Sequence, residues 1–333
     1  MSEPQGSHGV GQTGRQDQGQ GDRSYYGRPV LNPPVWEERE IAGYLFTGGL
    51  AGASSILAAA ADAGGAAGLV RPARLCASAA ISVSFVALIK DLGRPERFLN
   101  MLRVFKPTSP MSVGTWILSA YAPLNFAASA STLTGRAPRA GAVAGAGAGL
   151  LGSAVATYTA VLVADTAVPT WHEAHRELPF LFAGSAASAA GGFGLLAAAR
   201  AENGPARTMA VLGAVGELAA MRTLRQRLGP LAETLDTGPA GRRLRAAERL
   251  SVAGVIGAAL LGRRSRVAAA LAGGALMSAS ALTRFGIFAA GMASAEDPHW
   301  TVDLQRARIA AAATAAQPSP APNPASPAPV RSA

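Results

Sequence analysis

Eight hydrophobic stretches separated by charged connectors constrain this chain more than any other feature. Most of them approach the roughly 20 residues that an α-helix needs to cross the hydrocarbon core of a bilayer. The chain is 49% hydrophobic and only 15% charged, whereas a soluble domain of this size carries about a quarter charged residues. The sequence therefore predicts an all-α polytopic membrane protein with about eight transmembrane helices. The stretches cover 41–63, 73–92, 112–133, 140–164, 178–200, 207–222, 246–262 and 267–293.

The two ends of the chain differ from these stretches. Residues 1–35 are mostly Gly, Gln, Ser and Asp with few aliphatic side chains, which predicts a disordered tail without the layout of a signal peptide. Residues 310–333 are rich in Ala, Pro and Ser and are expected to form a second disordered tail. An even number of spans places both ends of the chain on the same side of the membrane.

The formal net charge of +10 lies largely in the connectors. This pattern is typical of membrane topology and lipid contact, and no nucleic-acid motif accompanies it. Connectors on the side of the termini hold thirteen Lys and Arg residues, against nine on the opposite side. The positive-inside rule then predicts cytoplasmic termini in a cell membrane.

Metal ligands are scarce in the hydrophobic stretches. The single cysteine, Cys76, provides neither a disulfide within the chain nor a cysteine-ligated cluster or zinc site. All four histidines lie outside the stretches, so axial ligands for a membrane haem are lacking; they are His8, His172, His175 and His299. We therefore expect no metal, haem or iron–sulfur cluster in this chain.

Two tyrosines lie at similar predicted depth near the side of the termini. Tyr44 is near the start of the first stretch and Tyr158 near the end of the fourth, and phenol hydroxyls there can donate to a quinone carbonyl. Glu40 shares a helix face with Tyr44, and Asp165 follows Tyr158 by two turns, so both carboxylates suit proton transfer. An interfacial aromatic belt and solvated helix ends explain the same residues, and geometry alone favours the belt.

Three further ionisable residues are candidates for proton transfer. Glu217 and Arg284 lie inside hydrophobic stretches, where such residues face the protein interior and pair or serve a pathway. A structural salt bridge between them is the alternative. Asp91 closes the second stretch, where it either organises the loop or admits protons.

The connector from Lys90 to Trp116 combines charge, proline and an amphipathic segment that could lie in the interface plane. Its Arg94, Arg97 and Lys106 predict contact with anionic lipid or an acidic partner. Trp171, at the start of the connector that holds two of the histidines, is a further candidate for docking.

Several motifs resemble the NrfD/PsrC-like family, the membrane subunits of polysulfide reductase and related complexes. The block from Phe105 to Met111, followed by Gly114 and Trp116, is similar to its F-[RK]-P-T-S-P-x-x-x-G-x-W signature. The resemblance extends over about 36–309. Further matching segments are Gly48 to Gly52, Thr157-Tyr158 with Ala164-Asp165 and Pro169 to Trp171, and, as in an actinobacterial branch, Thr283 to Gly286 with Asp297-Pro298.

The resemblance implies a first four-helix bundle over 36–176, which contains a quinone site, and a second over 177–309. It also implies a ferredoxin-like iron–sulfur subunit on the face of the termini and a molybdopterin catalytic subunit beyond it. Tyr158 stands where the family has a quinone-binding tyrosine, whereas Tyr44 replaces a histidine and Glu40 lies near its polar neighbour. Menaquinone is the expected quinone, and the subunit is not catalytic alone.

Two other functions fit the same residues. A transporter or ion-translocating subunit would line a path with Glu217, Arg284 and Asp62. A purely structural anchor would hold a degenerate site. The ion-translocating function predicts ion flux through the isolated protein. The structural anchor predicts that Tyr158→Phe leaves quinone turnover unchanged.

Overall fold

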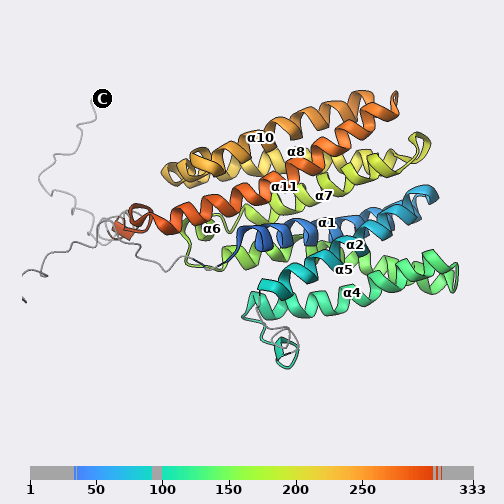
Figure 1. The fold of residues 1–333 in the computed structure, drawn as a ribbon, viewed down its shortest axis with the longest axis horizontal. Helices are drawn as coiled ribbons and strands as arrows, with labels where there is room; N and C mark the ends of the chain where they lie inside the picture. Colours follow the sequence, from blue (N-terminus) through green and yellow to red (C-terminus); the bar gives the residue numbers. More distant parts are fainter. Residues whose placement is uncertain (1–33, 35, 92–99, 303–304, 307–308, 310–333) are drawn as a thin grey trace, which may run out of the picture.

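The computed structural model describes residues 34, 36–91, 100–302, 305–306 and 309. Within these residues the secondary structure is helical and no strand occurs, which confirms the predicted all-α class. Eight helices of 19 to 31 residues form the body of the molecule, and each overlaps one of the hydrophobic stretches (Figure 1). They are α1 (Glu38–Ala63), α2 (Ala67–Asp91), α4 (Pro110–Thr134), α5 (Pro138–Ala164), α7 (Leu178–Ala197), α8 (Gly204–Leu228), α10 (Gly238–Ile256) and α11 (Arg266–Glu296).

Short helical segments connect the long ones. These are α6 (Pro169–Glu173), α9 (Glu233–Asp236), the 3₁₀ turns Arg200–Glu202 and Gly229–Ala232, and a π-helical turn at Gly257–Leu261. Proline occupies the first or second position of α4, α5, α7, α8 and α10. Its fixed φ suits a helix start and its missing N–H is not needed there, so these prolines define where the helices begin.

Five of the long helices, α1, α2, α5, α7 and α11, are long and apolar enough to cross a membrane. The chain is therefore a multi-pass membrane protein. The helices α4, α8 and α10 do not meet the same criteria of length and hydropathy. Among the described residues, five of the eight expected spans are thus supported.

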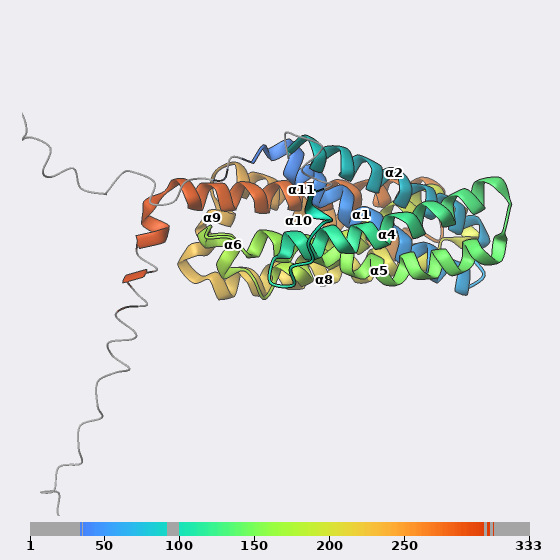
Figure 2. The same cartoon turned by 90° about the horizontal axis from the view of Figure 1, so that it is seen from below.

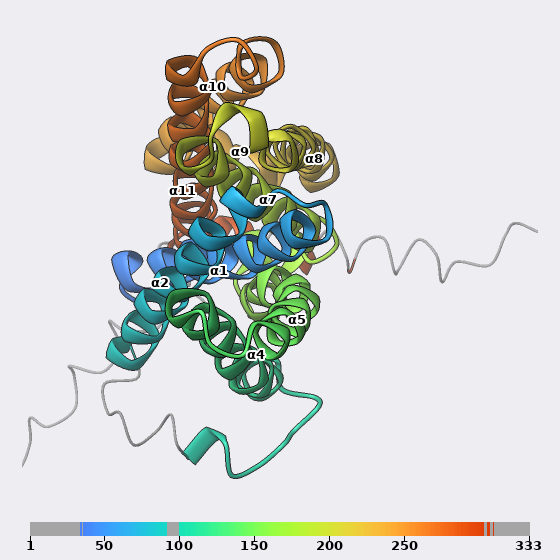
Figure 3. The ribbon, with the colours of Figure 1, turned by 90° about the vertical axis from the view of Figure 1, so that its right-hand side faces the viewer.

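The long helices run roughly along one axis, and α1 lies at their junction (Figures 1 and 3). It packs against α2 and α5, while α4 packs against α5 and α2. On the other side α7 packs against α8 and α11, and α10 packs against α11. Contacts of α1 with α7 and α11, and of α5 with α7, join the two sets of helices.

Glycine-to-glycine contacts bring helix backbones together, as expected for membrane helices. A Cβ on Gly52 of α1 would lie 2.4 Å from the carbonyl oxygen of Gly152 in α5. A Cβ on Gly192 of α7 would lie 2.6 Å from the carbonyl oxygen of Gly273 in α11. Side chains at these positions would force the helices apart, so glycine sets the helix spacing here.

The first and last long helices meet at one end of the molecule, which we call the terminal end (Figures 1 and 2). There Glu38 at the start of α1 pairs with Arg243 of α10. Trp36 stacks on Trp171, which also contacts Phe288 of α11 at a ring-centroid distance of 5.5 Å. The start of α1 thus lies beside α10 and α11 at this end, while the placement of both termini on one side of the membrane stays a prediction.

Candidate functional site

Tyr44 of α1 and Tyr158 of α5 lie on the terminal-end side of the contact between Gly52 and Gly152. Tyr44 is eight residues from Gly52 and Tyr158 is six residues from Gly152, which corresponds to about 12 and about 9 Å along antiparallel helices. Both side chains are buried, with 3% and 8% of their surface exposed. The helices thus hold the two phenols at similar depth inside the protein, and their burial argues against an aromatic belt facing lipid.

The ring of Tyr158 lies against α4 at Gly114, the glycine of the proline-rich signature. A Cβ on Gly114 would come within 2.4 Å of ring atom Cε2, so only glycine leaves room for the ring in this position. The Tyr158 hydroxyl is buried and has no hydrogen-bond partner among the described residues. A buried hydroxyl without a partner costs about 1–3 kcal/mol. A ligand that accepts a hydrogen bond would remove this cost.

Three carboxylates gather near the terminal end of α1 and α2. Asp91, the last residue of α2, lies close enough to Glu40 and Glu37 for their charges to repel one another. Glu40 precedes Tyr44 by one turn of α1. Asp165 is exposed where α5 ends, and its backbone N–H donates to Val161. The arrangement places carboxylates between the phenols and the aqueous end.

The proline-rich signature forms a closed turn before α4. The backbone N–H of Lys106 donates to the hydroxyl of Ser112, which in turn donates to the carbonyl of Val104. Phe105 packs edge-on against Trp116 with centroids 6.1 Å apart, and both rings are partly exposed. The side chain of Lys106 is exposed, as a docking surface requires. Arg94 and Arg97, the other residues predicted to dock, lie outside the described residues.

Trp171, also predicted to contact a partner, is fully buried. Its Nε1 donates to the carbonyl of Ile287 at 2.8 Å, and its indole fills the space that a side chain at Gly291 would occupy. It therefore packs α6 against α11. A partner cannot touch this side chain directly, so any effect of Trp171 on docking acts through the position of α6.

Glu217 and Arg284 are both buried, but their side chains do not meet in an ion pair. An oxygen of Glu217 accepts from the hydroxyl of Thr283 at 2.6 Å. The Arg284 guanidinium donates to the carbonyl of Phe182 at 2.7 Å and lies 3.6 Å from the centroid of its ring. The structure therefore does not show the direct salt bridge between Glu217 and Arg284 that was the alternative, although their charges still interact.

A polar network through α1, α2 and α4 was not identified from the sequence. The fully buried Tyr121 hydroxyl donates to the carbonyl of Ala51 at 2.9 Å and lies 2.8 Å from the Ser55 hydroxyl. Asn125, one turn further along α4, bonds to Ser55 and Ser78. The sequence signal for this network was the pair Tyr121 and Asn125, which lie four residues apart on one face of an apolar helix.

Within the described residues, no group of three or more His, Cys, Asp or Glu side chains is positioned to hold a metal ion. The rings of His172 and His175 lie 6.2 Å apart, and Nδ1 of His175 lies 2.9 Å from the carbonyl oxygen of His172.

Residues 30–234 match the family described as Polysulphide reductase, NrfD. Because the match covers more than half of the chain, the protein belongs to this family. Proteins of the family are membrane subunits of molybdoenzyme complexes and are linked to quinone. The match ends within α9, so α10 and α11 lie beyond it. No curated protein matches the chain.

Proposed function

We propose that this chain is the membrane anchor and quinone-binding subunit of a multi-subunit oxidoreductase. A quinone would bind at the terminal end of α1, α4 and α5, within reach of Tyr44 and Tyr158. The observation that carries the proposal is the buried Tyr158 hydroxyl, for which the described part of the chain provides no partner, on a ring that lies against the signature glycine, Gly114. A quinone carbonyl is an acceptor of the kind this hydroxyl needs.

The surrounding residues suit two-electron quinone chemistry, which takes up or releases two protons. Tyr158 and Tyr44 would orient the quinone through its carbonyl oxygens. Glu40 and Asp91, which interact across the ends of α1 and α2, would exchange protons between that site and water. Asp165 would contribute from the exposed end of α5.

The eight long helices would all cross the membrane, as two four-helix bundles over 36–176 and 177–309. The helix contacts favour this division, because α1, α2, α4 and α5 form one packed set and α7, α8, α10 and α11 the other. At the terminal end, α8 ends with a cluster of arginines and α10 begins with one. Both helices are less apolar than the five that meet the criteria for a span. Such clusters support cytoplasmic termini and contact with anionic headgroups.

The chain would receive electrons from a partner or pass electrons to it, since its own residues provide no cluster or haem ligands in the parts described. A ferredoxin-like iron–sulfur subunit would dock on the terminal end near Lys106, Arg94 and Arg97. A molybdopterin subunit would complete the complex. Menaquinone is the proposed quinone.

The test is quinone turnover by the intact complex with and without a functional Tyr158. The complex is isolated through a tag on this chain, and reduction of a menaquinone analogue is followed with a reduced viologen dye as electron donor. Tyr158→Phe should lower this turnover while dye-linked turnover at the molybdenum subunit persists. Unchanged quinone reduction would reject the proposed site and leave a structural anchor.

An ion-translocating subunit is a second candidate, and one observation favours it. Glu217 and Arg284 are ionisable, buried and incompletely hydrogen-bonded inside the second set of helices. This candidate predicts ion flux through the isolated chain in liposomes, whereas a quinone-binding anchor predicts none.

A further inference from the structure

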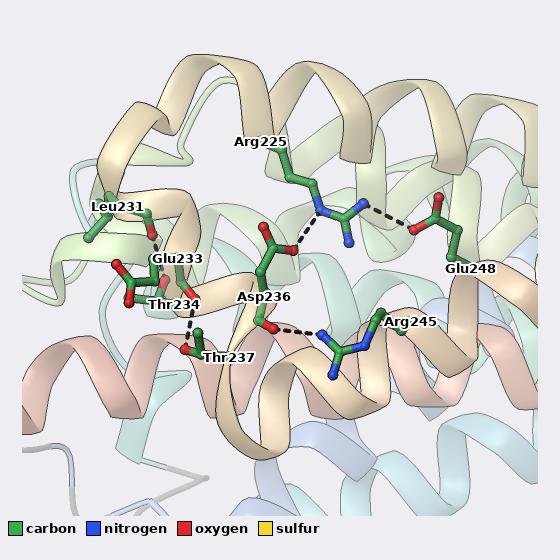
Figure 4. Close-up of polar contacts among 8 residues, drawn as sticks. All are labelled: Arg225, Leu231, Glu233, Thr234, Asp236, Thr237, Arg245 and Glu248. Atoms are coloured by element: carbon green, nitrogen blue, oxygen red, sulfur yellow. Dashed lines mark hydrogen bonds and ion pairs between the residues drawn. The ribbon is translucent and has the colours of Figure 1, made fainter.

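A surface groove separates α8 from α10 near the terminal end. Its volume is about 560 Å³, and its mouth carries Arg222, Arg225 and Glu248. Arg225 reaches across the groove to Glu248 at 3.0 Å and to Asp236 at 3.4 Å (Figure 4). The groove thus combines charged side chains with apolar ones, which are Leu218, Ala219, Met221 and Val252.

A second, much smaller cavity lies beside this groove and continues inward. The two share three lining residues, Leu218, Met221 and Glu248. The inner cavity has room for about one water molecule. Its lining includes the buried Glu217 and Thr283, so the cavity reaches from beside the groove to the buried carboxylate.

The buried polar atoms at the inner end lack protein partners. Glu217 has one oxygen bonded to Thr283 and one without a partner. Arg284 is fully buried, and its Nε and Nη1 also have none. Buried polar groups in native proteins are nearly always satisfied, commonly by ordered water. Of these atoms, the Glu217 oxygen belongs to a residue that lines the water-sized cavity, and this oxygen has no hydrogen-bond partner among the described residues, which indicates water there.

We propose that water enters the groove between α8 and α10 and reaches Glu217, so that this carboxylate exchanges protons with the aqueous phase at the terminal end. The charged groups that face Glu217 are Arg284 from α11 and Glu248 from α10, and α7 presents the hydroxyl of Ser185. The path lies in the second set of helices and goes beyond the proposed quinone site.

The inner end of this path points toward the helix that carries Tyr44. Nη2 of Arg284 would lie 3.3 Å from a Cβ on Gly49 of α1. Gly49 is five residues from Tyr44, about 7.5 Å along the helix. Arg284, whose charge interacts with that of Glu217, thus lies next to α1, about one and a half turns of the helix from Tyr44.

Hydroxyl-radical footprinting of the full chain in lipid nanodiscs tests the water path without any quinone or partner. Hydroxyl radicals formed from water oxidise methionines that water touches. Met221 is buried, with 7% exposed, but lines both cavities. Met209 and Met277 are less buried and line neither cavity. We expect Met221 to be oxidised several-fold faster than either, and equal or slower oxidation would overturn the proposal.

A blocking variant adds a second measurement. Ala247→Leu places a larger side chain into the inner cavity, and Ala246→Leu, on the neighbouring position of α10, is the matched control. Oxidation of Met221 should fall in the first variant and stay unchanged in the second. Oxidation that persists in a folded Ala247→Leu protein would contradict the path.

Infrared spectroscopy tests proton exchange at Glu217 itself. A pH titration of the wild-type chain should show a protonated-carboxyl C=O band that is absent from Glu217→Gln. This band should shift promptly in D₂O, and more slowly in Ala247→Leu. A band that ignores bulk pH and D₂O would refute proton exchange. Because neither experiment uses quinone, both outcomes are independent of the proposed quinone site.

Discussion

Replacing Gly114 by alanine tests the most specific structural feature of the proposed site. The new Cβ would lie 2.4 Å from Cε2 of Tyr158, whereas carbon atoms pack at about 3.5–4.0 Å. The Tyr158 ring or the start of α4 must therefore move by more than about 1 Å. Since a misplacement of about 1 Å can lower a rate by about 100-fold, quinone turnover should fall by about 10- to 100-fold.

Stability should change far less than turnover. Overpacking costs about 1–3 kcal/mol, and alanine recovers about 1 kcal/mol over glycine inside a helix. The net loss of unfolding free energy is then about 0–2 kcal/mol, so the chain should still assemble with its partners. The fall in turnover would thus report the position of the phenol rather than loss of the protein.

The assay is quinone reduction by the isolated complex, with thermal unfolding measured on the same preparation. Gly274→Ala is the matched control, because a Cβ at this helical glycine of α11 meets no atom within 4 Å. It should retain full turnover. If Gly114→Ala kept wild-type turnover and quinone affinity, the Tyr158 ring would not be held in a catalytically relevant position, and the reasoning would fail.

Four substitutions separate binding from folding. Tyr158→Phe removes a buried hydroxyl that has no hydrogen-bond partner among the described residues, so it should raise the unfolding free energy of the quinone-free protein by up to about 1–3 kcal/mol while quinone turnover falls about 10-fold. Tyr121→Phe should cost about 1–3 kcal/mol in denaturant unfolding and leave quinone turnover unchanged. Trp171→Ala should cost about 3–5 kcal/mol in the same assay, and a neutral result would contradict its role in packing α6. Asp62→Asn should cost less than about 1 kcal/mol, since this partner of Arg74 is half exposed, and quinone turnover should not respond.

The sequence predicted the helices well because their signal is local. Runs of apolar residues, proline at helix starts and small residues at contacts are all readable from neighbours in the chain. The similar depth of Tyr44 and Tyr158 also followed from counting residues along two antiparallel helices. The helices α4, α8 and α10 differ from the other five because their polar residues lower their hydropathy.

The details that the sequence could not supply depend on long-range packing. The role of Gly114 as the seat of the Tyr158 ring joins two helices that are far apart in the chain. Trp171 was predicted to dock a partner because it starts a connector, but Trp36 and Phe288 contact it from distant segments. Glu217 and Arg284 suggested an ion pair by depth alone, whereas Thr283 and Phe182 take their hydrogen bonds.

The most direct test of a quinone site at the terminal end of α1, α4 and α5 is photolabelling of the intact complex with an azido-quinone. Peptides around Tyr158, Gly114 and Tyr44 should carry the label, and excess unmodified menaquinone analogue should prevent it. Label that is confined to α7, α8, α10 and α11, or that excess quinone does not displace, would contradict the account.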